Sequence, residues 1–248
     1  MRKKVYPPEK AYKNLEFLVS HEARTVRILC EYLEPEARLR KLKVNNTVLF
    51  LGSSKADPKD KDSPLTKYYW EAEELAHRLV KWAIKLKPKG KNFVICTGGG
   101  PGIMEAANRG AARAGGKSIG MNISIPSEQY PNPYISPELS FLFHYFFMRK
   151  FWLVYEAKAV VAFPGGFGTL DEVFETLTLI QSEKLAKGDI PVILYGEEYW
   201  REVINFDALL KYKNISPEDL KLFCFHSNPE DAFSYLKKRL EEYLLESD

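Results

Sequence analysis

Two patterns of apolar residues alternate along this chain and predict strands and helices in turn. Residues 44–54 and 92–102 each contain a short, almost continuous apolar run, which is typical of a strand buried on both faces. Between them, residues 66–87 place apolar side chains at i, i+3 and i+4 spacing, which predicts a helix with one buried face. The apolar positions of this helix are Tyr69, Ala72, Leu75, Ala76, Leu79, Val80, Ala83 and Ile84.

The alternation continues through the rest of the chain. Strands are expected at 117–126, 159–166, 190–196 and near 220–225, and helices at 103–115, 148–158, 169–184 and 229–245. Strands separated by helices of this length form βαβ units around a parallel sheet. Right-handed crossovers then place helices on both faces of that sheet. The predicted fold is therefore α/β, a Rossmann-like, doubly wound and mostly parallel sheet.

The first 43 residues are rich in charge and depart from this pattern. Apolar residues there form a rough helical stripe, and Pro35 is expected to interrupt it because proline cannot donate the helical hydrogen bond. The stripe consists of Phe17, Val19, Val26, Ile28, Leu29, Tyr32 and Leu33. We predict an N-terminal helical extension, residues 1–43, packed on a main domain of residues 44–248.

The composition narrows the class of protein. Of the 248 residues, 45% are apolar and 28% are charged, and a formal net charge of +3 is too small to predict nucleic-acid binding. The three cysteines and four histidines show no disulfide-framework or metal-site spacing. The N-terminus lacks a signal-peptide core, and no apolar run approaches the ~18 residues that span a bilayer. We expect a cytoplasmic protein without a metal site that binds neither membranes nor nucleic acid.

Three predicted strands end in small residues at what would be the same edge of the sheet. These ends are residues 52–54, 97–102 and 164–169. In parallel α/β sheets, ligands bind at this carboxyl edge. In residues 97–102, four glycines in five positions precede a helix, so the backbone can approach an anion closely and the helix offers unpaired N–H groups. Phosphate is the favoured ligand of this segment.

Two other nucleotide motifs are disfavoured. The glycine spacing is not GxGxxG, and the strand at 117–126 ends without the acidic residue that binds a ribose, so no dinucleotide cofactor is predicted. Residues 111–118 resemble a P-loop, but Ala111 replaces its first glycine and the segment closes a helix. We predict that the protein uses no cofactor.

The glycine loop at 164–168 is followed by Thr169, Asp171 and Glu172, which allow two interpretations. Thr169 and Glu172 fit the capping box S/T-x-x-E, with Thr169 as the helix cap. That interpretation leaves the glycine loop unexplained. Alternatively, the loop and Thr169 hold a phosphate while Glu172 faces a part of the ligand that becomes positive. Cleavage of an N-glycosidic bond in a nucleotide generates such a charge, and a fixed carboxylate stabilises it.

Two features just before this loop also have two interpretations. Arg149 and Lys150 are typical of a solvated corner, but the planar guanidinium of Arg149 is suited to clamp a phosphate or ribose oxygen. The aromatic tract at 141–147 is more typical of a core or a subunit interface than of a platform for base stacking.

Together, these motifs resemble the LONELY GUY family of nucleoside 5′-monophosphate phosphoribohydrolases, often described as lysine decarboxylase-like. The hallmark PGGxGTxxE is complete at residues 164–172, and the upstream Arg-Lys pair is Arg149-Lys150. The segment 52–54 matches the GSS motif of the family, and the segments 97–111 and 120–132 match its longer bacterial branch. No signature of a pyridoxal phosphate lysine supports the decarboxylase description.

The resemblance implies an activity and a set of site residues. Members hydrolyse a nucleoside 5′-monophosphate, AMP-like or a cytokinin riboside monophosphate, to free base and ribose 5-phosphate, and they are homodimers or larger homo-oligomers. By resemblance Glu172 and Arg149 are catalytic. The implied nucleotide-binding residues are Ser53, Ser54, Thr97, Gly98, Gly99, Gly100, Gly102, Lys150, Gly165, Gly166, Gly168 and Thr169. The loop at 127–140 and the aromatic tract are expected to select the base.

The same fold and loops also allow a different function. A protein that binds a nucleotide or a molybdopterin-type cofactor as a carrier, without turnover, would need the same phosphate-binding loops. Intact Arg149 and Glu172 favour the hydrolase over the carrier.

Overall fold

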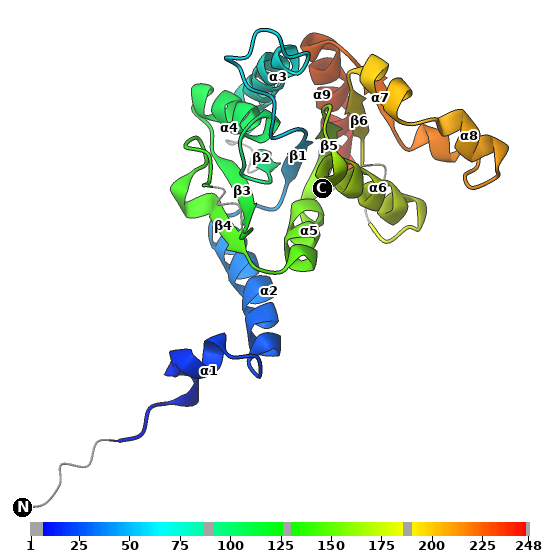
Figure 1. The fold of residues 1–248 in the computed structure, drawn as a ribbon. Helices are drawn as coiled ribbons and strands as arrows, with labels where there is room; N and C mark the ends of the chain where they lie inside the picture. Colours follow the sequence, from blue (N-terminus) through cyan, green and yellow to red (C-terminus); the bar gives the residue numbers. More distant parts are fainter. Residues whose placement is uncertain (1–6, 87–91, 126–129, 186–189, 247–248) are drawn as a thin grey trace, which may run out of the picture.

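A computed structural model describes residues 7–86, 92–125, 130–185 and 190–246 of the chain. These described residues form a seven-stranded sheet in the order β4-β3-β2-β1-β5-β6-β7, in which all neighbouring strands are parallel (Figure 1). The strands are β1 (Thr47–Leu51), β2 (Val94–Thr97), β3 (Ser118–Ile123), β4 (Ser140–Phe143), β5 (Ala157–Ala162), β6 (Val192–Tyr195) and β7 (Cys224–His226).

Helices cover both faces of the sheet, which confirms the predicted doubly wound fold. One face packs against α3 (Thr66–Ile84), α4 (Ile103–Arg113) and α9 (Pro229–Glu246). The other packs against α2 (Arg24–Lys41), α5 (Phe146–Tyr155), α6 (Phe167–Gln181) and α7 (Glu197–Val203). The remaining elements are α1 (Leu15–Val19), α8 (Phe206–Lys211) and the 3₁₀ turns η1 (Ala11–Lys13), η3 (Pro137–Leu139) and η4 (Asp219–Lys221).

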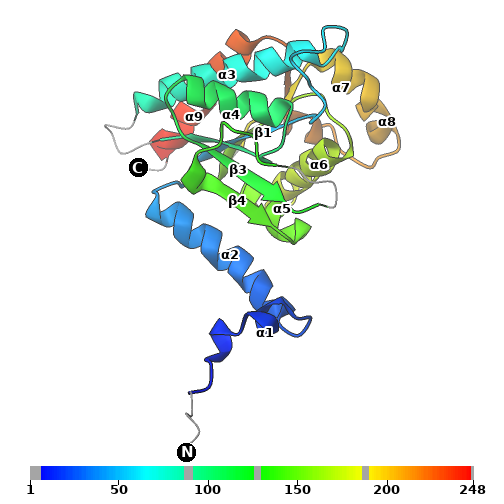
Figure 2. The same cartoon turned by 60° about the vertical axis from the view of Figure 1, so that its left-hand side comes forward.

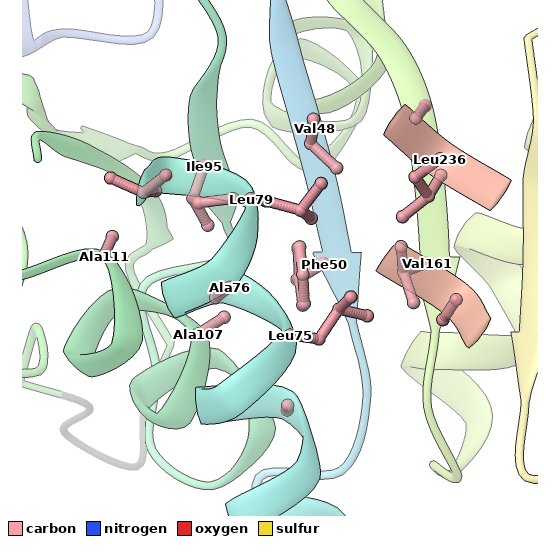
Figure 3. Close-up of a cluster of buried hydrophobic side chains, with 14 of the residues drawn as sticks. Val48, Phe50, Leu75, Ala76, Leu79, Ile95, Ala107, Ala111, Val161 and Leu236 are labelled. Atoms are coloured by element: carbon pink, nitrogen blue, oxygen red, sulfur yellow. The ribbon is translucent and has the colours of Figure 1, made fainter. Parts of the chain in front are cut away.

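The central strands supply side chains to the cores on both faces. In β1, Val48 and Phe50 belong to the core beneath α3, α4 and α9, whereas Leu49 and Leu51 belong to the opposite core. Figure 3 shows the first core, where Leu75 of α3 lies beside Phe50. Because successive side chains in a strand point to opposite faces, a strand buried on both sides needs apolar residues at every position. This requirement explains the continuous apolar runs in the sequence.

The strand order places the centre of the sheet between β1 and β5. From β1 the chain adds β2, β3 and β4 on one side, and it then returns to add β5, β6 and β7 on the other. The connections that leave β1 and β5 therefore diverge at their carboxyl ends. Such a switch point opens the crevice where doubly wound sheets bind ligands.

The aromatic tract at 141–147 divides between two elements. Its first part is the edge strand β4, in which Phe141 and Phe143 are buried while Leu142 is 68% exposed. Its last two residues, Phe146 and Phe147, begin α5. The sequence does not reveal this strand because the residue on its outer face is as apolar as the residues on its inner face.

The helix α2 continues through Pro35, so the expectation that this proline interrupts the helix is wrong. Proline at position 35 lacks the N–H that would bond the carbonyl of Glu31 one turn earlier. That carbonyl instead accepts a 2.9 Å hydrogen bond from Nε1 of Trp152 on α5. A tertiary contact thus satisfies the group that the proline leaves unpaired.

The described part of the N-terminal segment projects from the body of the molecule (Figure 2). Its helix α2 lies against the body, where Leu39 and Pro35 are buried. The division into an extension at 1–43 and a main domain at 44–248 stays a prediction. No helix within the described ranges combines the length and the apolar character needed to cross a membrane.

We expect Trp152→Phe to destabilise the wild-type chain more than it destabilises a Pro35→Ala variant. In the wild type it leaves the Glu31 carbonyl without a donor, at a cost of ~1–3 kcal/mol, whereas the alanine of the Pro35→Ala variant restores the helical N–H. Urea unfolding of the wild type, both single variants and the double variant gives the coupling free energy, expected to be about 1 kcal/mol. Equal losses in both backgrounds would contradict this compensation.

Candidate functional site

A cavity of about 330 Å³ lies at the carboxyl edge of the sheet, where β1, β2 and β5 end side by side. The loops that follow these strands line it together with α5, the start of α4 and the first turns of α6. The lining residues are Leu51, Gly52, Ser53, Ser54, Lys55, Gly98, Met104, Arg149, Leu153, Gly166, Phe167, Gly168, Thr169 and Glu172. The three small-residue strand ends therefore meet at one site.

Backbone hydrogen bonds of Ser53 hold the three loops together. Its N–H donates to the carbonyl of Pro164 in the loop after β5, over 2.9 Å. Its own carbonyl accepts the N–H of Ile103, the first residue of α4, over 3.0 Å. The hydroxyl of Ser53 accepts the N–H of Lys55 and lies at the cavity wall. The floor of the cavity is thus a fixed arrangement of backbone groups.

The N-cap of α6 lies three residues earlier than the capping box predicts. The helix begins at Phe167 with Gly166 at the N-cap, and the Thr169 side chain lies inside the first turn, so the expected Thr169 cap is wrong. Apart from their chain neighbours and the adjacent helix backbone, no described atom lies within 4 Å of the position that a Cβ would take at Gly166 or Gly168. The open glycine backbone and the unpaired N–H groups of this 15-residue helix face the cavity and favour an anion there.

Glu172 and Arg149 form the charged wall of the cavity. The side chain of Glu172 is 6% exposed and that of Arg149 is 16% exposed, and Nη2 of the arginine lies 3.7 Å from Oε1 of the glutamate. The other carboxylate oxygen, Oε2, and the Nε of Arg149 find no hydrogen-bond partner among the described residues. Because buried polar groups are almost always paired, this pair of unsatisfied atoms indicates a ligand site.

Burial makes Glu172 an acid that titrates near neutral pH. Loss of solvent raises the pKa of Glu172 to about 7, against the opposing charges of Arg149 and Lys150. Burial also lowers the pKa of Arg149, but a guanidinium remains charged at neutral pH. A carboxyl group with a pKa close to 7 can take up and release a proton during a reaction.

Lys150 connects the two helices that carry these residues. Its Nζ lies 2.9 Å from Oδ2 of Asp171 and 3.0 Å from Oε2 of Glu175, both on α6. These ion pairs join α5 to α6 on the side away from the cavity lining. Lys150 therefore fixes the spacing between Arg149 and Glu172.

The loop after β2 contributes Gly98 to the lining and is supported from below. The buried Thr97 hydroxyl donates to Oδ1 of Asn108 over 2.8 Å and accepts the N–H of Gly99 over 3.0 Å. The side chain of Asn132 donates to the carbonyls of Gly99 and of the next residue. Thr97 thus shapes the loop from inside the fold.

Two further glycines allow the loops to approach one another. Gly102 has a φ of +69°, and a Cβ there would lie 2.2 Å from the carbonyl oxygen of Ser53. A Cβ at Gly165 would lie 2.1 Å from Oγ1 of Thr169. Both positions therefore require glycine for the geometry of the loops.

The cavity includes half of the predicted nucleotide-binding residues. Those that line it are Ser53, Ser54, Gly98, Gly166, Gly168 and Thr169. Those that the structure describes outside the lining are Thr97, Gly99, Gly100, Gly102, Gly165 and Lys150. Their roles in binding stay predictions.

The structure also adds lining residues that sequence reasoning missed. One of them is Lys55, which directly follows the serines at the end of β1. Its position as a cation next to a predicted phosphate-binding motif could have identified it from the sequence. Phe167 occupies the variable position of PGGxGT and is 92% exposed at the cavity. Met104, in the first turn of α4, had no distinguishing signal. Residues 126–129, in the loop expected to select the base, lie outside the described residues.

The comparison with protein families shows which family the chain belongs to. The model of the family described as "Possible lysine decarboxylase" matches residues 104–236, more than half of the chain. The chain belongs to this family. Together with the relatives below, the match confirms the resemblance to LONELY GUY proteins.

Individual relatives of this family member agree with that assignment. The pyrimidine/purine nucleotide 5′-monophosphate nucleosidase of Escherichia coli K12 is 31% identical over 129 residues, which cover 45% of this chain and 27% of that protein. The chain therefore matches about a quarter of the length of that relative.

Solved structures agree in fold. The X-ray structure of TM1055 covers 78% of this chain and 99% of its own, at 23% identity and a TM-score of 0.53. The molybdenum cofactor carrier protein of Chlamydomonas reinhardtii covers 80% of this chain and 99% of its own, at 20% identity and a TM-score of 0.53. At these identities the likeness shows the fold alone.

We expect Glu172→Gln to gain stability relative to the wild type as the pH rises. The ordinary pKa of Glu172 is 4.5 and its folded pKa is about 7, so the folded chain holds this proton more tightly than the unfolded chain does. The free energy of unfolding of the wild type therefore falls as the pH rises from the ordinary pKa toward the folded pKa. Just above the folded pKa it stops falling, because Glu172 is then ionised in both the folded and the unfolded chain. The neutral glutamine avoids this loss of stability.

The measurement is urea unfolding of both proteins at about pH 5 and about pH 8. The difference in free energy of unfolding, variant minus wild type, should rise by ~2 kcal/mol over this range. The attraction of Arg149 for the ionised carboxylate is already contained in the folded pKa, and any effect of the glutamine on packing does not depend on pH here, so the change with pH is the test. A flat difference would mean that the buried carboxyl has an ordinary pKa.

Proposed function

We propose that this chain hydrolyses the N-glycosidic bond of a nucleoside 5′-monophosphate, AMP-like or a cytokinin riboside monophosphate, and releases free base and ribose 5-phosphate. The observation that carries the proposal is the buried pair of Glu172 and Arg149, which holds two unsatisfied polar atoms and lines the same cavity as the N-terminus of α6. The cavity volume of about 330 Å³ falls in the range of roughly 300–1,000 Å³ found for small-ligand sites.

The phosphate is held at the start of α6. The N–H groups at Phe167 and Gly168 carry the positive end of the helix dipole, and the open glycine backbone allows close approach. The hydroxyl groups of Ser53 and Ser54 and the cation of Lys55 complete this side of the cavity. This set of donors suits a 5′-phosphate dianion.

Glu172 acts on the ribose, one helical turn beyond Thr169. As the bond between C1′ and the base nitrogen breaks, positive charge develops on the ribose ring, and a nearby carboxylate stabilises it. The hydroxyl of a water molecule bonds to C1′, and its proton passes to Glu172. The base leaves with the bonding electron pair and takes up a proton from Glu172 or solvent, which balances the reaction.

Arg149 serves both the ligand and the carboxylate. Its Nη2 lies beside Oε1 of Glu172, so its charge favours the ionised carboxylate that accepts the water proton. Its unpaired Nε can donate to an oxygen of the sugar or the phosphate. The guanidinium stacks on Phe146 at 5.1 Å, which fixes its orientation.

The relatives support this choice of reaction. The chain belongs to a family that includes a protein named for cleaving pyrimidine and purine nucleotide 5′-monophosphates. The site residues Arg149, Thr169 and Glu172 all fall within the segment that the family model matches. The carrier proteins of similar fold keep open the alternative of binding without turnover.

We expect the purified protein to release free base from at least one of AMP, GMP, CMP, UMP and a cytokinin riboside monophosphate, as measured by chromatography. Glu172→Gln should lower kcat by at least ~100-fold, or ~2.7 kcal/mol of transition-state stabilisation, because it removes the charge and keeps the shape. Glu202→Gln, the same change at an exposed residue of α7 outside the cavity lining, is the control and should keep kcat within a few-fold.

Two results would overturn the proposal. Base release at an unchanged rate in Glu172→Gln would remove the carboxylate from the mechanism. Tight nucleotide binding by the wild type without release from any of the five nucleotides would favour the carrier.

A further inference from the structure

An apolar stripe runs along the outer face of α2 and is exposed to solvent. Val26 is 41% exposed, Leu29 52% and Leu33 54%, and Cys30 and Ala37 are exposed between and beyond them. Their spacing of i, i+3, i+4, i+7 and i+11 places all five on one side of the helix. We call this set the outer stripe.

The element before α2 also lacks cover. The helix α1 has five residues, none of which is buried. Leu15 is 69% exposed and Val19 is 66% exposed. So short a helix is not stable by itself in water. Both views show α1 and the start of α2 pointing away from the body (Figures 1 and 2). The exposed apolar residues of this helix pair are suited to contact an apolar surface of another molecule.

The charges at the two ends of the outer stripe favour a second copy of this chain as the partner. Glu22 lies exposed in the turn before α2, and Arg40 and Lys41 lie exposed in its last turn. Two copies of α2 in parallel would place like charges together. Two antiparallel copies that pair Leu29 with Leu33 bring Glu22 of one next to Arg40 of the other, at both ends. The stripe is therefore complementary to itself under a two-fold rotation.

We propose that α2 pairs with α2 of a second copy of this chain, antiparallel, through the outer stripe. The two-fold axis passes between Leu29 and Leu33, so the two copies of Cys30 face each other across it. No residue of the outer stripe lines the cavity, so this contact is separate from the candidate active site.

A crosslinking experiment on Cys30 tests the proposal without any substrate. In a Cys224→Ser background, Cys30 is exposed and Cys96 is buried, so a short thiol-specific crosslinker reacts at Cys30. We expect a covalent dimer on a denaturing gel at micromolar protein concentration, and a dimer or larger assembly by light scattering. Leu29→Glu with Leu33→Glu should lower the crosslinked fraction by at least ~10-fold, because it buries like charges at the axis.

The control is Leu245→Glu, the same change at a residue of α9 that is 78% exposed, which should leave crosslinking unchanged. Thermal melts of the variants establish that each is folded. Absence of a Cys30 crosslink in the parent protein would overturn the proposal. So would equal crosslinking in the double glutamate variant, which would place the assembly on another surface.

A separate set of contacts on the inner side of α2 concerns Arg149. The Glu31 carboxylate accepts the N–H of His144 at Oε1 over 2.7 Å and the N–H of Tyr145 at Oε2 over 3.2 Å. Tyr145 is the N-cap of α5, and its own side chain does not cap the helix. The backbone carbonyl of Glu31 also accepts the N–H of the Trp152 side chain. Glu31 therefore provides three acceptor atoms to α5 and the two residues before it. A negative charge at this position also suits the positive end of the α5 dipole.

These contacts lie one helical turn from the arginine of the site. The N–H of Arg149 bonds to the carbonyl of Tyr145 over 3.2 Å, so the start of α5 sets the position of the Arg149 backbone. We infer that Glu31 is a positioning residue for Arg149, an inference that rests on the proposed function. The N-terminal segment then takes part in the site without touching it.

The test separates the contact from the activity. Glu31→Ala should raise the rate of amide hydrogen exchange at His144 and Tyr145 by at least ~10-fold. The same variant should lower kcat ~10-fold with little change in KM. In both measurements Glu31→Gln should fall between Glu31→Ala and the wild type. The control is Glu34→Ala, which loses an exposed pair with Arg38 on the same helix. Faster exchange with unchanged kcat, or unchanged exchange, would overturn the inference. If the wild type releases no base, the proposed function fails and AMP affinity replaces kcat as the readout.

Discussion

The parallel pairing of β1 with β5 is the contact on which the rest of this structure depends. The two strands are neighbours at the centre of the sheet, although the chain adds three other strands between them. Their pairing brings the loop after β1 to the loop after β5, where the N–H of Ser53 bonds to Pro164. Since the connections from the two strands diverge, the cavity opens at this point and at the start of α6.

At this junction, the burial of Glu172 lowers the stability of the fold but gives the carboxyl group a pKa suited to catalysis. The fold buries Glu172 beside Arg149 with one oxygen unpaired, which disfavours its ionised form and moves its pKa toward neutrality. A well-packed apolar residue would stabilise a core more. Retention of a charged group in such a place is typical of a functional site, where an unsatisfied atom becomes a contact to the ligand. Lys150 supports the arrangement by ion pairs that join α5 to α6.

Glu31 gives the N-terminal helix α2 a set of polar contacts with the helix that carries Arg149. Pro35 frees the carbonyl of Glu31, Trp152 uses it, and the carboxylate of the same glutamate binds the start of α5. The opposite side of α2 bears the exposed outer stripe. One helix therefore offers a polar clamp to α5 and an apolar face to solvent.

The sequence by itself determined the fold class and the edge of the sheet where the small-residue loops meet, and it marked Arg149 and Glu172 as candidates for the reactive groups. Apolar periodicity and glycines at strand ends are local properties, so they can be recognised without knowledge of the tertiary contacts. The resemblance in motifs added the reaction class, and the family match agrees with it.

Only the tertiary structure decided how these parts work together. It placed Gly166 and Gly168 at the cavity and Gly99 and Gly102 in the supporting turns, a distinction that depends on which atoms lie next to each glycine. It moved the start of α6 ahead of the expected Thr169 cap and carried α2 through Pro35 by a hydrogen bond from Trp152. The roles of Gly99 and Gly102 and the passage of α2 through Pro35 come from contacts between residues far apart in the chain, whereas periodicity and motif spacing describe only neighbours along it.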